Sequence, residues 1–250
     1  MSRMRIATWN LDRPTKNRVS ARQERLDQIA RIDADVWVLT ETDRTLRIGE
    51  YPPVATMRPE PKRYSDSEAY AAIHAKLRLH QVPVETFDSR FAVCAEVPDS
   101  PIGPLLVYGS IITYHNDGVM EGTAKRWELH RASCVAHAAD WAKFRGAYPN
   151  HTLIAAGDFN QALDRVGRYR DAESTRLLWD AFNGADLKCL TASDFVAEGK
   201  LKSRHSVDHI AVSKHSMQNL DFSVAAWEGT TADGVKLSDH NGVMVTLTGR

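Results

Sequence analysis

The sequence predicts a layered sandwich of the α/β or α+β class. Short apolar runs of strand length alternate with longer amphipathic segments along all 250 residues. The predicted strands are joined both by helical segments and by hairpin-like connections, a mixture typical of layered sheets and helices. Because no Ser- or Gly-rich linker divides the chain, we expect residues 1–250 to form a single domain.

The predicted strands are short runs rich in β-branched and other apolar residues. They are Ile6 to Trp9, Val36 to Leu39, Tyr70 to Leu79, Phe91 to Val97, Leu105 to Thr113, Leu153 to Ala156, Val207 to Val212 and Gly242 to Leu247. Their even spread from one end of the chain to the other favours sheets assembled from the whole sequence.

A first helix is predicted from Ser20 onward. Ser20 and Gln23 form a capping-box pattern, and Leu26, Ile29 and Ala30 fall on one helical face. Such a pattern is typical of a helix that covers one side of a sheet.

Two further helices are predicted from seven-residue and helical spacings of apolar residues. In the segment 123–145, apolar residues recur at Trp127, Cys134 and Trp141, with Val135, Ala138 and Ala142 beside them. His130 and His137 of this segment are expected in solvent or at the edge of the core. The segment 174–187 has its apolar face at Leu177, Leu178, Ala181 and Phe182.

Charge and cysteine content exclude several classes of protein. Lys plus Arg and Asp plus Glu are both 32, and this zero net charge weakens the case for binding nucleic acid by counterion release alone. The three cysteines are unpatterned and odd in number, which argues against a disulfide framework. Since neither CxxC nor HExxH occurs, a structural zinc site or zinc protease is not expected.

The sequence also lacks signals for a membrane or for export. No apolar stretch approaches the roughly 20 residues that span a bilayer, and no apolar signal core follows Met1. We therefore expect a cytoplasmic protein without a membrane span, and a monomer is the favoured oligomeric state.

Polar residues gather where the predicted strands begin or end. They are Asn10, Asp12, Glu41, Tyr114, His115, Asp158, Asn160, Asp208, Asp239 and His240. Carboxylate and amide oxygens are suitable ligands for Mg²⁺ or Mn²⁺. An Asp can orient and deprotonate a water, and a cationic His held by a second Asp can neutralise charge on phosphoryl oxygens. No GxSxG elbow or GxxxxGK[ST] loop supports a different mechanism.

Five motifs in order resemble those of the endonuclease/exonuclease/phosphatase superfamily. They are Thr8-Trp-Asn-Leu-Asp12, Leu39-Thr-Glu41-Thr, Gly157-Asp-Phe-Asn160, Ser206-Val-Asp-His-Ile210 and Ser238-Asp-His240. The resemblance covers nearly the whole chain. It implies a DNase I-like, four-layer αββα sandwich of two packed mixed sheets flanked by helices, with the active site at one edge.

The resemblance also implies a role for each motif residue. Glu41 would be the principal metal ligand, with Asn10 and Asp12 near the metal and Asp239 a further ligand. Asp158 would activate the attacking water, which Asn160 and Asn10 would position. His240 would donate to a phosphoryl oxygen, and Asp208 would hold His240 in its charged state. The implied cofactor is Mg²⁺ or Mn²⁺.

The resemblance leaves one position open between two neighbours. The family places a Tyr or His at the end of the central strand, and Tyr114 and His115 are adjacent here. Neighbouring strand residues point to opposite faces, so only one is expected in the site, and Tyr114 is favoured.

The substrate is predicted only as a class. Basic residues follow three of the motifs, and together they would form a basic rim that favours a polyanion. They are Arg13, Lys16, Arg18, Arg44, Arg47, Arg165, Arg168 and Arg170. Trp227 is a candidate for stacking on a base, although packing in the core is favoured. His115, Arg13, Arg165 and Trp227 are thus the candidate substrate-binding residues.

Three hypotheses about function follow. The favoured one is a nuclease, endo- or exonucleolytic, that hydrolyses phosphodiesters of DNA or RNA. The second is a phosphatase or phosphodiesterase for a small or lipid-linked phosphate ester. The third, an inactive binding module, is opposed by the intact Glu41, Asp158, Asp208 and His240. The segment 200–206, before Asp208, contains no aromatic residue, which does not support specific recognition of abasic DNA.

Overall fold

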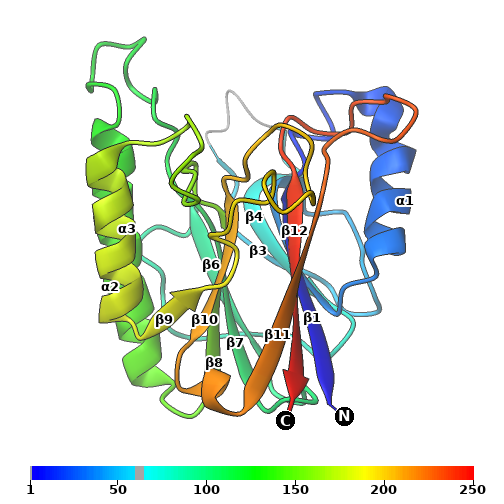
Figure 1. Cartoon of the computed structure of the whole chain (residues 1–250), viewed down its shortest axis with the longest axis vertical. Helices are drawn as coiled ribbons and strands as arrows, with labels where there is room; N and C mark the ends of the chain where they lie inside the picture. The colour runs from blue at the N-terminus through cyan, green and yellow to red at the C-terminus, as the bar shows by residue number, and fades with distance from the viewer. Residues whose placement is uncertain (1, 60–64) are drawn as a thin grey trace.

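The computed structural model describes residues 2–59 and 65–250. Two six-stranded mixed sheets pack face to face, with α1 outside one sheet and α2 and α3 outside the other (Figure 1). The predicted four-layer αββα sandwich is therefore confirmed. Among the described residues, no helix has both the length and the apolar character needed to cross a membrane.

The first sheet has the order β11-β12-β1-β2-β4-β3. Its strands are β1 (Arg3–Asn10), β2 (Val36–Asp43), β3 (Val54–Ala55), β4 (Glu68–Ala75), β11 (Leu220–Trp227) and β12 (Gly242–Gly249). The second sheet has the order β5-β6-β7-β8-β10-β9. Its strands are β5 (His80–Gln81), β6 (Ala92–Val97), β7 (Leu105–Ile111), β8 (Thr152–Asp158), β9 (Leu187–Cys189) and β10 (Asp208–Ser213).

The helices are α1 (Arg22–Ile32), α2 (Glu128–Ala147) and α3 (Ala172–Gly184), with short 3-10 turns at η1 (Val19–Ala21) and η2 (Ser216–Gln218). Three apolar clusters hold the layers together. One lies between the sheets, one between the second sheet and α2 and α3, and one between the first sheet and α1. Burial of these apolar faces is the main force that fixes the order of the layers.

Strand pairing brings the polar strand ends to one edge. In the first sheet β1 runs parallel to β2, so that Asn10 lies beside Thr40, the residue before Glu41. In the second sheet β8 and β10 are antiparallel, and Asp158 lies directly opposite Asp208. This edge is at the end of the sandwich away from the two chain termini (Figure 1).

The first helix does not begin with a capping box. No side chain caps α1, which continues directly from η1, and Ala30 is exposed rather than buried. The buried face instead contains Ile29 and Arg25, whose side chain is 1% exposed. Arg25 can be buried because its guanidinium donates to three carbonyls: Leu237 (2.6 Å), Arg18 (3.0 Å) and Asn17 (3.1 Å).

The expectation for the two histidines of α2 is wrong, because His130 and His137 are fully buried. Cys134 and Trp141 lie in the core as predicted, whereas Val135 is exposed. His130 is accommodated because its ring nitrogens contact Ser174 Oγ (3.0 Å) and the Phe159 carbonyl (3.1 Å). Burial lowers the pKa of both rings to about 4, so both are neutral in the folded protein.

Several elements differ from expectation. The short strands β3, β5 and β9 and the edge strand β11 were not predicted, and β11 exposes one of its faces, so that only alternate residues such as Leu220 and Val224 meet the core. Trp227, at its end, is a core residue. Its ring packs edge-on against Trp9 and Trp37, so it is not available to stack on a base. The three cysteines are buried free thiols, as expected.

Candidate active site

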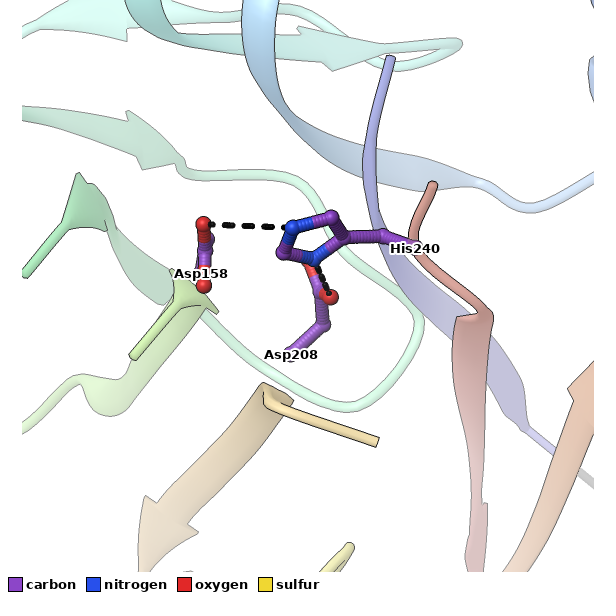
Figure 2. A group of neighbouring side chains, drawn as sticks. All are labelled: Asp158, Asp208 and His240. Atoms are coloured by element: carbon purple, nitrogen blue, oxygen red, sulfur yellow. Dashed lines mark hydrogen bonds and ion pairs between the residues drawn. The ribbon is translucent and has the colours of Figure 1, made fainter. Parts of the chain in front are cut away.

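Two aspartates and one histidine meet at the polar edge of the sandwich. Asp158 ends β8, Asp208 begins β10, and His240 lies two residues before β12, so the group draws on both sheets. Figure 2 shows the imidazole of His240 between the two carboxylates. Its Nδ1 is 2.7 Å from Asp208 Oδ2, and its Nε2 is 4.0 Å from Asp158 Oδ2.

The first of these distances is a hydrogen bond and the second is too long for one. Asp208 therefore fixes the ring by Nδ1, whereas Nε2 keeps its proton for another acceptor. Burial disfavours a charged His240, but the carboxylates of Asp158 and Asp208 outweigh it and raise its pKa. His240 is thus a cation at neutral pH, held in place by Asp208.

Asp158 is held by amide groups as well as by its place in β8. Its carboxylate accepts from the Asn160 backbone (2.8 Å), from Asn160 Nδ2 (3.2 Å) and from Asn10 Nδ2 (3.1 Å). Burial raises its pKa above the ordinary value, and the nearby Asp208 charge adds to this effect. A raised pKa makes an aspartate a stronger base toward a bound water.

Asn10 connects Asp158 to Glu41. Its Nδ2 donates to Glu41 Oε1 as well as to Asp158 (both 3.1 Å), while its Oδ1 accepts from the backbone of Asp12 (2.8 Å). In this arrangement Asn10 positions two carboxylates, and its oxygen is already used. Glu41 has a left-handed backbone with φ of 43°, the kind of local strain that is often found at functional sites.

Glu41 and Asp239 are the carboxylates of this edge whose oxygens are suitable ligands for a hard divalent cation. Both line the same cleft. Burial raises the pKa of Glu41, the Asn10 hydrogen bond opposes this, and the charge of Asp239 raises it further. Two carboxylates that repel each other in a partly buried place are suited to bind Mg²⁺ or Mn²⁺, which would neutralise both.

The structure does not bring the Asp12 carboxylate to this group. Asp12 forms an ion pair with Arg18 and accepts a hydrogen bond from Asn17 Nδ2 (2.7 Å). In this structure its carboxylate holds the loop after β1 in place. We leave Asp12 out of the proposed ligand set for this reason.

Of the adjacent pair, only Tyr114 lines the cleft. Both residues lie beyond the end of β7 at Ile111, so strand alternation does not decide their directions. His115 is 6% exposed and its Nδ1 is 2.7 Å from the hydroxyl of Tyr169. Tyr169 in turn donates to Asn160 Oδ1 (3.2 Å), so His115 is linked to the site through this chain and through its packing on the Tyr114 ring.

Gly157 is required by the close approach of β8 to β7. Its φ is 141°, and a Cβ at this position would lie 1.8 Å from the Ser110 carbonyl oxygen. No other residue fits there without moving β7, which explains the glycine directly before Asp158.

The cleft in front of these residues has a volume of about 1160 Å³. Its lining includes the cations Arg13, Lys16, Arg168 and Arg204. The predicted basic rim is thus present in part. Arg13 also pairs with Glu68 (2.9 Å), and the predicted Arg165 is exposed but does not line the cleft.

Sequence reasoning missed several residues that position the site. Arg25 links the loop after β1 to Leu237, close to His240, and His130 contacts the carbonyl of Phe159 between Asp158 and Asn160. Ser238 donates to the Asn10 carbonyl (2.6 Å) and accepts from the His240 backbone (3.0 Å). Only Ser238 carried a sequence signal, since it belongs to the Ser238-Asp-His240 motif.

The fold and this group of residues define an enzyme that hydrolyses phosphoester bonds. A model of the endonuclease/exonuclease/phosphatase family matches residues 7–240, and the chain belongs to that family. A comparison with curated proteins gives no match.

Solved structures share the fold. The endonuclease domain of TRAS1, a telomere-specific non-LTR retrotransposon, is similar with a TM-score of 0.62 and 15% identity, over 97% of each chain. A humanized TDP2 of D. rerio is similar with a TM-score of 0.62 and 20% identity, over 99% of this chain and 100% of the other. Identities this low establish a common fold and no shared substrate.

Proposed function

We propose that this protein is a Mg²⁺- or Mn²⁺-dependent nuclease that cleaves phosphodiester bonds of DNA or RNA by attack of water on phosphorus. The observation that carries the proposal is that Glu41 and His240 line one cleft that also contains cations, while the buried carboxylates of Asp158 and Asp208 lie on either side of the His240 ring. Asp158, Asp208 and His240 supply a base and an acid for hydrolysis, and Glu41 supplies a metal site.

The roles follow from the contacts. Asp158, held by Asn160 and Asn10, orients the attacking water and takes its proton. His240 donates from Nε2 to a phosphoryl oxygen, because its Nδ1 is occupied by Asp208. Glu41 and Asp239 would hold the divalent cation, which when bound stabilises negative charge on the phosphate.

The cleft favours a polymer over a small ester. Its volume of about 1160 Å³ exceeds the roughly 300–1,000 Å³ of most small-molecule pockets. Its lining combines cations with the aromatic residues Tyr70, Phe91, Tyr114 and Tyr169. Positive charge that follows a phosphate backbone and aromatic rings that stack on bases are the usual means of binding single-stranded nucleic acid.

The test is hydrolysis by the purified protein of single-stranded DNA, duplex DNA, RNA and a panel of phosphomonoesters, with EDTA, Mg²⁺ or Mn²⁺. We expect metal-dependent cleavage of a polynucleotide that Asp158→Asn nearly abolishes, since the amide cannot accept the proton of water. Asp180→Asn, on the exposed face of α3, is the matched control and should leave the rate unchanged. Release of phosphate from monoesters alone would assign the protein to the phosphatases instead.

The metal site can be tested without turnover. Glu41→Gln removes one of two mutually repelling carboxylates, so the variant should melt at a higher temperature than wild type in EDTA. Adding Mg²⁺ should raise the melting temperature of wild type and have little effect on the variant. An equal shift in both proteins would mean that Glu41 does not bind the ion.

A further inference from the structure

A second aspartate–histidine pair lies on the wall of the same cleft. His205 lines the cleft, and its Nδ1 forms an ion-pair contact with Asp164 Oδ2. Asp194 is a second carboxylate near the same nitrogen, at 3.8 Å. Among the described residues, only this group and Asp158, Asp208 and His240 bring carboxylates and a histidine within 4.8 Å of one another.

Backbone hydrogen bonds fix the position of the Asp164 carboxylate, the partner of His205. Asp164 is on the loop between β8 and α3, and its Oδ1 accepts from the backbones of Val166 (3.0 Å) and Gly167 (2.7 Å). The carboxylate is therefore fixed before it meets His205. A histidine whose Nδ1 contacts a fixed carboxylate has a fixed ring orientation, and its Nε2 is the ring nitrogen left to meet a ligand.

His205 does not stand alone on this wall. Arg168, from the same loop as Asp164, and Arg204, beside His205, also line the cleft and are exposed. The Arg204 guanidinium donates to the Asp239 carbonyl, which places this cationic wall next to the catalytic group. Arg13 and Lys16 line the cleft from the loop after β1, which belongs to the other sheet.

We propose that His205, oriented by Asp164 and assisted by Arg168 and Arg204, binds a phosphate of the substrate that neighbours the scissile one. This subsite rests on the proposed nuclease function and deepens it. A substrate held there needs at least two phosphates, and with Arg13 and Lys16 on the opposite side its chain continues past the cut in both directions. The arrangement favours a polynucleotide cleaved within its chain over a mononucleotide ester.

The test compares two substrates of the full-length enzyme in Mg²⁺: a single-stranded 12-mer oligonucleotide and bis(p-nitrophenyl) phosphate, which has one phosphate. His205→Ala should raise KM for the 12-mer roughly tenfold, the effect of losing one charge-assisted hydrogen bond at a half-exposed site. Its kcat should change less than about twofold, and bis(p-nitrophenyl) phosphate hydrolysis should be unchanged.

A second pair of variants distinguishes a phosphate-binding role of His205 from a role that only connects two loops through Asp164. His205→Asn can still bond to Asp164 but cannot extend a second nitrogen toward the phosphate, and we expect it to behave like His205→Ala. His205→Arg supplies a cationic donor and should bring KM most of the way back to the wild-type value. His80→Ala, in β5 at the end of the sandwich away from the cleft, is the matched control.

The possible failures are distinguishable. If wild type cleaves both substrates and His205→Ala slows both equally, or if His205→Asn behaves as wild type, the phosphate subsite is refuted and the nuclease function stands. If wild type hydrolyses bis(p-nitrophenyl) phosphate but no oligonucleotide, the nuclease function and the subsite both fail.

Discussion

Asp208 is expected to act on the reaction mainly through His240, and a double-mutant cycle tests this. Asp208 is fully buried, its Oδ2 is 2.7 Å from His240 Nδ1, and its Oδ1 has no hydrogen-bond partner within the described residues. Its only other influence on the catalytic group is the effect of its charge on the pKa of Asp158. The effects of Asp208→Asn and His240→Ala should therefore not multiply.

The magnitudes follow from the contacts. His240→Ala removes a preorganised donor to the phosphoryl group and should lower kcat on the order of 10²–10³-fold. Asp208→Asn leaves the ring in place but removes a charge that favours its cationic form, so a loss of about 10–10²-fold is expected. The double variant should be no slower than His240→Ala, which gives a coupling energy of about 1.4–2.7 kcal/mol.

The assay is cleavage of one oligonucleotide at saturating concentration and fixed salt by the four proteins of the cycle. Stability gives an independent readout, because His240→Ala leaves the buried Asp208 carboxylate without a partner, at a cost of about 3–5 kcal/mol. Adding Asp208→Asn should recover part of this loss and raise the melting temperature. A double variant that is slower than His240→Ala by the full factor lost in Asp208→Asn alone would refute the reasoning, since Asp208 would then act independently of His240.

Three predictions concern stability and can be measured by urea denaturation. Gly157→Ala should cost more than about 2 kcal/mol because its Cβ meets the Ser110 carbonyl, whereas Gly146→Ala, in open space on α2, should stabilise by about 0.5–1 kcal/mol; a mild effect at Gly157 would show that β7 and β8 can separate. Arg25→Ala should cost about 3–5 kcal/mol by leaving three carbonyls unpaired, and the exposed Arg22→Ala less than about 0.5 kcal/mol. Burial lowers the pKa of His74 to about 4, whereas its pKa in the unfolded chain is near 6.5. Between these two pH values only the unfolded chain binds a proton at His74, so the free energy of unfolding decreases as the pH is lowered below about 6.5. His74→Leu cannot bind this proton. The free energy of unfolding of His74→Leu minus that of wild type should therefore increase by about 1.4 kcal/mol when the pH is lowered from 7.5 to 5.5. A difference that does not change with pH would count against a neutral buried His74.

The sequence was sufficient to predict the layers and the residues that meet at the polar edge. Strands with continuous apolar runs, such as β7 and β8, were predicted because both of their faces are buried. The group around Asp158, Asp208 and His240 was predicted because each residue stands at a strand end, and strand ends of packed sheets share an edge. Edge strand β11 had no such signal, since its exposed face breaks the apolar run.

Polar residues in the interior were the main source of error. A helical pattern of apolar residues cannot show that Arg25 and His130 are buried, because each depends on a partner far along the chain. His137 is buried with a partner in its own helix, the carbonyl of Ser133 (2.8 Å). The same limit applies to Asp12. Its place in the motif made it a candidate ligand, but its ion pair with Arg18 depends on the backbone of the loop after β1. His205 and Asp164 are 41 residues apart in the sequence, so their contact could be seen only in the folded structure.

The active group is divided between the two sheets, with Asn10, Glu41 and His240 on one and Asp158 and Asp208 on the other. Neither sheet alone contains a base, an acid and a metal site, so a half-folded chain has no means of cutting a phosphodiester. The rate of turnover should therefore depend strongly on the position of one sheet relative to the other. A core substitution that slides one sheet by a fraction of an ångström should change the 4.0 Å gap between His240 and Asp158, and so the rate, before it changes the melting temperature.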